Sequence, residues 1–286
     1  MSSVKCQTLS LFEKAGNGSE NQQARVGEKY VFRLHSGSFG KERGKMRDYG
    51  VELKNRVAFI QRLLAESGAA GIVYGNSGGK DSALVGILCK KACDNTVGVI
   101  LPCQSKVNFG TDMSDGLLVA DQFAIETRTV DLSDVKASLV KALDGHTGLN
   151  KAALSNIAPR LRMTALYAVA AAENRMVAGT GNRSEIHMGY FTKWGDGGHD
   201  FNPISDLTAT QVFEFLKYLG APKSIIEKAP SAGLFEGQTD EADMGITYKK
   251  IDEYLETGKA SAKDLEIIHR YHNRSQHKRR LPATFQ

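Results

Sequence analysis

The stretch Tyr74-Gly75-Asn76-Ser77-Gly78-Gly79-Lys80-Asp81-Ser82 joins a short apolar run to an apolar helical segment. Adjacent glycines let a backbone turn tightly and approach a ligand without a Cβ clash. Where such a turn opens a helix, the unpaired N–H groups and the helix dipole favour a bound anion. Hydroxyl groups such as those of Ser77 and Ser82 add donors for phosphate oxygens. We therefore expect a phosphate-binding turn between a strand and a helix, made by Gly75, Asn76, Ser77, Gly78, Gly79, Lys80, Asp81 and Ser82.

The carboxylate of Asp81 adds a second requirement to this turn. It would repel bound phosphates unless a cation lay between them, and Mg²⁺ prefers oxygen ligands together with substrate phosphates. Asp81 is therefore a predicted Mg²⁺ ligand. The turn does not match a Walker loop, because Gly75 and Gly79 are one position too close and Asp81 replaces the hydroxyl residue. A dinucleotide-binding fingerprint is also excluded, because its third glycine is missing.

Strand-like and helix-like segments alternate on both sides of this turn. Such alternation is typical of an α/β fold in which a doubly wound parallel sheet is flanked by helices. The last third of the chain is expected to be helical. The expected strands are 70–75, 97–101, 127–130 and 175–179, and the expected helices are 49–68, 83–93, 112–123, 132–143, 156–173, 209–219, 248–255 and 262–273.

The composition separates the first 45 residues from the rest. Residues 1–45 are rich in small polar and basic residues without an apolar period, so we expect a mobile extension, with 46–286 as a single domain. No apolar run approaches the roughly 20 residues that span a bilayer, and no signal-peptide pattern is present. These features predict a cytoplasmic protein that does not associate with membranes. The net charge of +5 is too small and dispersed to indicate nucleic-acid binding.

A second polar segment follows the expected strand 175–179. A turn at the carboxyl end of a parallel strand lines the ligand crevice of a doubly wound sheet. On residue types alone, Glu185 can complete the Mg²⁺ site with Asp81, Lys193 can contact a phosphate and Asp200 can orient a substrate. A glycine-rich surface loop with solvated charges explains the same composition equally well.

A family resemblance decides between these interpretations. The motif Ser-Gly-Gly-x-Asp-Ser at 77–82 resembles the N-type ATP pyrophosphatases, in which this loop holds the β,γ-pyrophosphate of ATP while a substrate oxygen attacks the α-phosphate. Gly-Thr-Gly-Asn-Arg-Ser-Glu at 179–185 and Gly-Tyr-Phe-Thr-Lys-Trp-Gly-Asp-Gly-Gly at 189–198 resemble the signature of the ammonia-dependent NAD synthetases. Segments 229–234, 240–255 and 277–280 resemble later parts of the same family, so the likeness covers roughly residues 46 to 282.

This resemblance implies a reaction, a fold and a set of site residues. It implies a ligase that forms a C–N bond, converting deamido-NAD, ATP and ammonia to NAD, AMP and pyrophosphate through an acyl-adenylate. It implies an adenine nucleotide alpha hydrolase-like fold, Mg²⁺ as cofactor and a homodimer. Implied for ATP are 75–82, Thr180 and Ser231; for Mg²⁺, Asp81 and Glu185; and for deamido-NAD, Arg160, Lys193, Asp200, His277 and Lys278.

Two positions depart from the family pattern. The family has Arg-Leu-Pro-Tyr after the second strand, whereas this chain has Ile100-Leu101-Pro102-Cys103. Ala209 stands where a lysine that contacts ATP is common in the family. Neither position is assigned an ATP role, and no base for ammonia is identified.

Free ammonia is the expected nitrogen donor, because the 45 residues ahead of Met46 are too few for the hydrolase domain of glutamine-dependent members. Two alternatives are another enzyme of the loop class, such as a tRNA-thiolating protein, and a non-catalytic nucleotide sensor. A catalytic cysteine pair and a strongly basic surface would favour the first, and neither is evident. Retention of both Asp81 and Glu185 argues against the second, because sensing does not need a metal.

Overall fold

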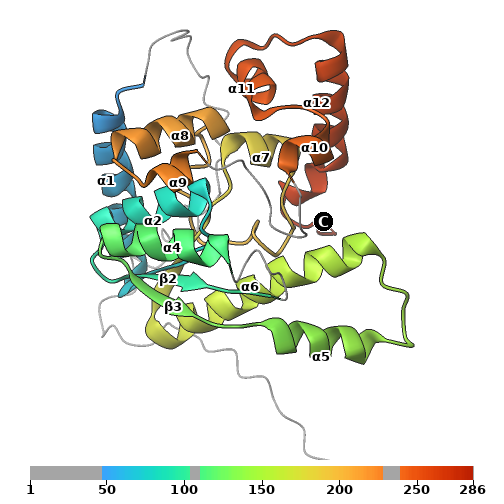
Figure 1. The fold of residues 1–286 in the computed structure, drawn as a ribbon, viewed down its shortest axis with the longest axis horizontal. Coiled ribbons are helices and arrows are strands. Elements are labelled where there is room, and N and C mark those ends of the chain that lie inside the picture. The colour runs from blue at the N-terminus through green and yellow to red at the C-terminus, as the bar shows by residue number, and fades with distance from the viewer. Residues whose placement is uncertain (1–46, 104–109, 228–238, 286) are drawn as a thin grey trace, which may run out of the picture. The chain divides into compact units, whose positions relative to one another are not determined.

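The computed structural model describes residues 47–103, 110–227 and 239–285, all within the unit Arg43–Gln286 (Figure 1). The expected extension at 1–45 lies outside the described residues. The elements in chain order are α1 (Tyr49–Ser67), β1 (Gly71–Gly75), α2 (Lys80–Ala92), β2 (Thr96–Ile100), α4 (Thr111–Gln122), β3 (Glu126–Thr129), α5 (Ser133–Leu143), α6 (Lys151–Glu173), β4 (Arg175–Ala178), α7 (Arg183–Met188), α8 (Ala209–Tyr218), α9 (Lys223–Ile226), α10 (Asp240–Met244), α11 (Tyr248–Thr257), α12 (Ala262–Arg274) and the 3₁₀ helix η2 (Gln276–Lys278).

The four strands form a parallel sheet in the order β3-β2-β1-β4, which confirms the predicted parallel sheet. The chain builds outward from β1 to β2 and β3, and then returns to place β4 on the other side of β1. The connections therefore reverse direction between β1 and β4. Ligands of such sheets bind beyond the carboxyl ends of the strands at this reversal point.

Helices cover both faces of the sheet. Successive side chains of a strand point to opposite faces, and in β1 the side chains on both faces are apolar and need a partner layer. Ile72 and Tyr74 of β1 pack into one core with α1, α2 and α8. Val73, between them, packs into a second core with Leu166 and Ala170 of α6. Both faces of β1 are thus buried, which explains why its residues form a continuous apolar run and do not alternate with polar residues.

A third core holds the helical C-terminal part together. Met188, Ala209, Met244, Ile251 and Ile268 are buried in it, and they come from α7, α8, α10, α11 and α12. Figure 1 shows α11 and α12 side by side at the red end of the chain. The predicted helical C-terminal third is confirmed for the described residues.

One helix begins earlier than predicted, and one expected turn contains a helix. Helix α6 begins at Lys151 rather than at 156, because the Asn150 side chain caps it by accepting from the Ala153 N–H at 2.9 Å, and Pro159 is accommodated inside the helix. The polar segment after β4 was expected to be a turn, but it contains the short helix α7. The Asn182 and Glu185 side chains stabilise the start of α7 by a reciprocal capping box.

The phenol of Tyr74 is the least compensated polar group of the sheet. The side chain is fully buried, and its hydroxyl has no hydrogen-bond partner among the described residues. Gly86 on α2 and Gly98 on β2 leave the space for the ring, since a Cβ at Gly86 would lie 2.3 Å from the hydroxyl. Burial raises the pKa of Tyr74, so the hydroxyl stays protonated. An unsatisfied buried polar group of this kind lowers stability by about 1–3 kcal/mol.

We therefore expect Tyr74→Phe to increase the free energy of unfolding by about 1 kcal/mol, measured by urea denaturation, since the change removes an unpaired hydroxyl from the core. Tyr49→Phe is the matched control. The Tyr49 hydroxyl donates to Glu214 Oε2 at 2.6 Å, so its removal should decrease stability by about 1 kcal/mol. A loss of stability in Tyr74→Phe equal to that of the control would show that the buried hydroxyl has a partner.

Candidate active site

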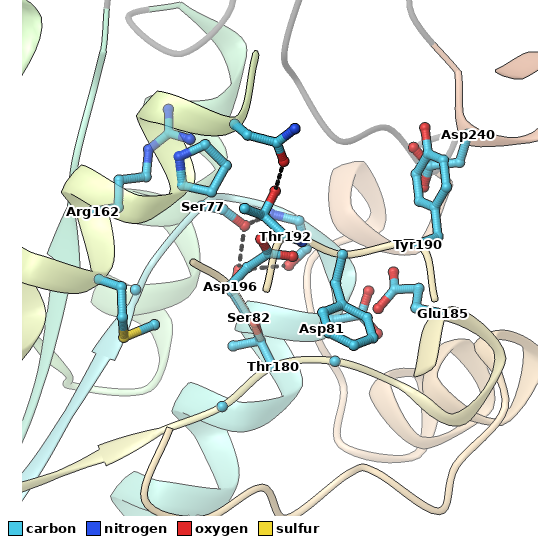
Figure 2. Close-up of a pocket in the computed structure, with 18 of the residues that line it drawn as sticks. Ser77, Asp81, Ser82, Arg162, Thr180, Glu185, Tyr190, Thr192, Asp196 and Asp240 are labelled. Carbon is cyan, nitrogen blue, oxygen red and sulfur yellow. Dashed lines mark hydrogen bonds between the residues drawn. The ribbon is translucent and has the colours of Figure 1, made fainter. Parts of the chain in front are cut away.

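A cavity of about 1280 Å³ lies at the reversal point of the sheet. Its lining comes from the turn that follows β1, the segment that follows β4 and one face of α6, parts of which Figure 2 shows. The α12–η2 region completes the lining. Segments far apart in the sequence thus meet in one space. The cavity is large enough for nucleotide-sized ligands, which occupy clefts of roughly 300–1000 Å³.

The predicted phosphate-binding turn forms one wall of this cavity. Gly78 has a φ of +72°, and a Cβ there would lie 2.0 Å from the carbonyl oxygen of Asp112, so only glycine fits. Gly79 caps α2 without a side-chain hydrogen bond, which leaves N–H groups of the first turn to a ligand. All predicted turn residues except Gly78 line the cavity, namely Gly75, Asn76, Ser77, Gly79, Lys80, Asp81 and Ser82.

Polar contacts inside the turn hold its shape. Ser77 Oγ donates to Ser82 Oγ at 3.0 Å, and the Gly79 N–H donates to Ser77 Oγ at 3.3 Å. Asn76 is buried and turned toward α4, where its Nδ2 donates to the Gly116 carbonyl at 3.0 Å. Both serines line the cavity, and the Asn76 side chain anchors the turn to α4.

Three charged side chains converge at the end of the turn. The Lys80 ammonium contacts the Asp81 carboxylate and lies 3.9 Å from Glu185 Oε1. Burial would lower the pKa of Lys80, but the carboxylates of Asp81 and Glu185 outweigh it and the pKa is raised. Burial, together with the charge of Asp81, raises the pKa of Glu185 well above its usual range. Figure 2 shows Asp81 and Glu185 side by side.

Asn182 orients both carboxylates, and the sequence interpretation missed it. Its Nδ2 donates to Asp81 Oδ1 at 3.0 Å, and its backbone N–H donates to Glu185 Oε2 at 3.1 Å. Its Oδ1 accepts from the Glu185 N–H at 3.0 Å, which completes the capping box. The spacing Asn-x-x-Glu is a recognised helix-start pattern and could have identified this residue.

The carboxylates of Asp81 and Glu185 suit a hard divalent cation. They are two partly buried, adjacent oxygen donors beside a phosphate-binding turn, and their mutual repulsion is only partly compensated by Lys80. Within the described ranges, no group of three or more His, Cys, Asp or Glu side chains could hold a metal. A cation at this position would therefore need phosphate or water oxygens as further ligands, as Mg²⁺ does in nucleotide sites.

Helix α6 and the segment after α7 together form a second, polar wall of the cavity. Thr192 Oγ1 donates to Asn156 Oδ1 at 2.6 Å, and the Thr192 N–H donates to Asp196 Oδ1 at 3.0 Å. Asp196 lines the cavity, and burial among protein groups raises the pKa of its carboxyl. Arg162 lines the same region and donates from Nε to the Leu101 carbonyl at 2.8 Å.

The sequence interpretation favoured Arg160, whereas the structure places Arg162 in the cavity. Arg160 is exposed on another face of α6, where its Nε donates to the Lys193 carbonyl at 3.3 Å. The helical spacing of Pro159, Arg162 and Leu166, all of which line the cavity, is the signal that could have distinguished the two arginines.

The basic C-terminal motif at 277–280 contributes another part of the cavity wall. Lys278 Nζ donates to the carbonyls of Gly189 and Phe191 at 2.8 and 2.6 Å, and burial lowers the pKa of this lysine. Lys193 Nζ donates to the His277 carbonyl at 2.8 Å. His277 and Lys278 line the cavity, and so do Arg270 and Arg274 of α12, which no sequence motif indicated.

The remaining predicted residues have different positions. Thr180 lines the cavity directly after β4. Asp200 is not part of the lining: its carboxylate accepts from the Val177 N–H at 2.7 Å and from the Tyr167 hydroxyl at 3.0 Å, which fixes the edge of β4. Lys193 also lies outside the lining. Ser231 lies outside the described residues.

Comparison with known proteins supports the interpretation of the motifs. A family model described as NAD synthase matches residues 52–282. The NH(3)-dependent NAD(+) synthetase of Carboxydothermus hydrogenoformans is 49% identical over 229 residues, which are 79% of this chain and 93% of that protein. The solved structure described as NMN synthetase from Francisella tularensis has a TM-score of 0.79 and 40% identity, covering 84% of this chain and 99% of that one.

A second solved structure extends the likeness. The NH3-dependent NAD synthetase from Campylobacter jejuni, in complex with the nitrate ion, has a TM-score of 0.71 at 28% identity and covers 84% of this chain and 100% of its own. The sequence resemblance stated above is therefore confirmed, and the chain belongs to the NAD synthase family.

Proposed function

We propose that this protein catalyses the ATP-dependent amidation of the nicotinate carboxylate of deamido-NAD by ammonia, giving NAD, AMP and pyrophosphate. The observation that carries this proposal is the meeting, in one cavity, of the phosphate-binding turn after β1 with the Glu185 carboxylate after β4. Membership of the NAD synthase family and the names of its relatives support it.

In the first step, the nicotinate carboxylate attacks the α-phosphorus of ATP, pyrophosphate leaves, and an acyl-adenylate forms. A free carboxylate resists ammonia because oxide would have to leave, whereas AMP is a good leaving group. The turn 75–82 would hold the pyrophosphate portion with its N–H groups and the hydroxyls of Ser77 and Ser82. Thr180 and Ser231 are proposed as further ATP contacts.

Mg²⁺ is the proposed cofactor, with Asp81 and Glu185 as its protein ligands. When bound there it would offset the negative charge that builds on the phosphates. Asn182 contributes by fixing one oxygen of each carboxylate through hydrogen bonds, which orients both carboxylates beside the phosphate-binding turn.

In the second step, ammonia displaces AMP from the acyl-adenylate. The dinucleotide would lie along the wall formed by α6 and η2, where His277 and Lys278 line the cavity. We retain Arg160 and Lys193 as proposed contacts at its margin, because they are joined to each other and to His277 through backbone carbonyls. Asp200 is retained as well, because it is bonded to β4 just before the strand reaches the cavity at Ala178. The free thiols of Cys89, Cys93 and Cys103 suit a reducing compartment, so we place the reaction in the cytoplasm.

Nicotinate mononucleotide is the second candidate substrate, because one solved relative is described as an NMN synthetase. It carries the same reacting carboxylate as deamido-NAD but lacks the adenylate half. An enzyme that binds the adenylate half uses that contact to lower the barrier at the carboxylate. We favour the dinucleotide because the curated relatives of this chain are named as NAD synthetases.

Purified protein with ATP, Mg²⁺, ammonium and deamido-NAD should form NAD and AMP in equal amounts, measured by liquid chromatography. With nicotinate mononucleotide we expect kcat/KM to fall by at least about tenfold, since the adenylate contacts are lost. Asp81→Asn should reduce the rate roughly 100-fold, whereas the exposed Asp94→Asn should not change it. Higher kcat/KM with the mononucleotide would reassign the substrate, and AMP formation only with tRNA would reject the proposed reaction.

We further propose a homodimer that pairs through α5. This helix has no buried residue, and Val135 and Leu139, four positions apart on one face, are 49% and 38% exposed. Its packing within the chain is against α6, beside it in Figure 1. An apolar stripe that remains exposed on an amphipathic helix is typical of an interface.

Sedimentation equilibrium should therefore find a dimer that Leu139→Glu converts to monomer, because the new carboxylate would be buried without a partner. Leu118 on α4, which is 46% exposed, provides the matched control, and Leu118→Glu should remain dimeric. A dimer that survives Leu139→Glu would exclude α5 from the interface.

A further inference from the structure

Lys80 is enclosed by charged and aromatic groups although it lies in the phosphate-binding turn. Its side chain is only 6% exposed, and its ammonium contacts the Asp81 carboxylate and approaches Glu185 Oε1 to 3.9 Å. The rings of Phe213 on α8 and Tyr248 on α11 lie 5.7 and 5.5 Å from the ammonium. The side chain is thus held by three parts of the fold rather than extended into the cavity.

These contacts do not suit a phosphate-binding lysine. A lysine that binds phosphate needs a mobile ammonium with donors free to reach the ligand. Lys80 instead directs its charge to the two carboxylates, and its ammonium lies over two rings, where cation–π attraction adds to the ion pair. Its position at the first residue of α2 also disfavours a cation electrostatically, so the carboxylates must supply the attraction.

The charges of this cluster determine how strongly it attracts a metal ion. The carboxylates of Asp81, Glu185 and Asp240 all act on Lys80, so its single positive charge offsets only part of the negative charge that this cluster can carry. A divalent cation that entered between the carboxylates would also meet the ammonium at short range, in an environment that screens charge weakly. The triphosphate of a nucleotide would bring additional negative charge to the same place.

We infer that Lys80 is the internal counter-ion of the metal site: it holds Asp81 and Glu185 together without metal and makes metal binding depend on the nucleotide. This inference rests on the metal role proposed above for the two carboxylates. Lys80 is then a positioning residue, because it acts through Asp81 and Glu185 and not on the substrate. The protein would take up its metal with ATP rather than before it.

The test is the affinity of the nucleotide-free protein for Mn²⁺, a spectroscopic substitute for Mg²⁺, measured by electron paramagnetic resonance. Wild-type protein should bind Mn²⁺ weakly alone and at least about tenfold more tightly with α,β-methylene-ATP. Lys80→Met keeps an unbranched side chain of similar shape beside the two rings but removes the charge. We expect this variant to bind Mn²⁺ without nucleotide at least about tenfold more tightly than wild type.

Lys90→Met is the matched control, since Lys90 lies on the same helix, pairs with exposed Asp94 and is not part of the cavity lining. Its Mn²⁺ affinity should equal that of wild type. Lys80→Met should also have a lower melting temperature, which Mn²⁺ restores, whereas a purely structural role of Lys80 would leave the loss unrestored. Lys80→Gln serves the same comparison if the methionine variant does not fold.

Two failures are distinguishable. The counter-ion role is wrong if, without nucleotide, the Lys80 variants bind Mn²⁺ no more tightly than wild type. It is also wrong if nucleotide-free wild type already binds Mn²⁺ as tightly as the nucleotide complex does. In both cases the metal site itself stands. If no protein binds Mn²⁺ even with α,β-methylene-ATP, the metal role of Asp81 and Glu185 is wrong and the inference is rejected with it.

Discussion

Burying charge is the constraint around which this site is organised. The side chains of Lys80, Asp81 and Glu185 are 6%, 16% and 18% exposed, and charges so far from water must be paired or compensated by hydrogen bonds. Asn182 provides those hydrogen bonds to both carboxylates while it caps α7. The start of α2, the start of α7 and the segment between β4 and α7 are consequently fixed relative to one another. A cavity wall with a defined charge follows from this arrangement.

The topology of the sheet brings these groups together. The order β3-β2-β1-β4 makes β1 and β4 neighbours although about 100 residues separate them in the chain. Because both strands end at the same edge, the phosphate-binding turn and the Glu185 helix share one space. The turn packs directly against α4 at Gly78, because glycine has no side chain that would collide with the Asp112 carbonyl. The helices of the C-terminal part complete the cavity through Arg270, Arg274, His277 and Lys278.

The sequence was informative wherever chemistry is local. The turn 75–82, the parallel sheet and most helices follow from glycine spacing and apolar periodicity, and all but one of the turn residues line the cavity. It was less informative where a role depends on distant partners. Arg160 and Arg162 are chemically identical, and the orientation of α6 decides which one enters the cavity. The contacts of Lys80 with Phe213 and Tyr248, 133 and 168 positions later, cannot be read from its own segment. The hydrogen bonds that Asp200 accepts beside β4 likewise depend on residues far from it in the sequence.

Nucleotidyl transfer to a carboxylate is the central chemical claim. It explains why the phosphate-binding turn is combined with two carboxylates, whereas a Walker loop combines its turn with a lysine and a hydroxyl residue. The most direct test uses deamido-NAD labelled with ¹⁸O in its nicotinate carboxylate, with mass spectrometry of the products. Attack on the α-phosphorus predicts that one labelled oxygen appears in AMP and none in pyrophosphate. Label in inorganic phosphate together with ADP, or unlabelled AMP alongside NAD, would contradict it.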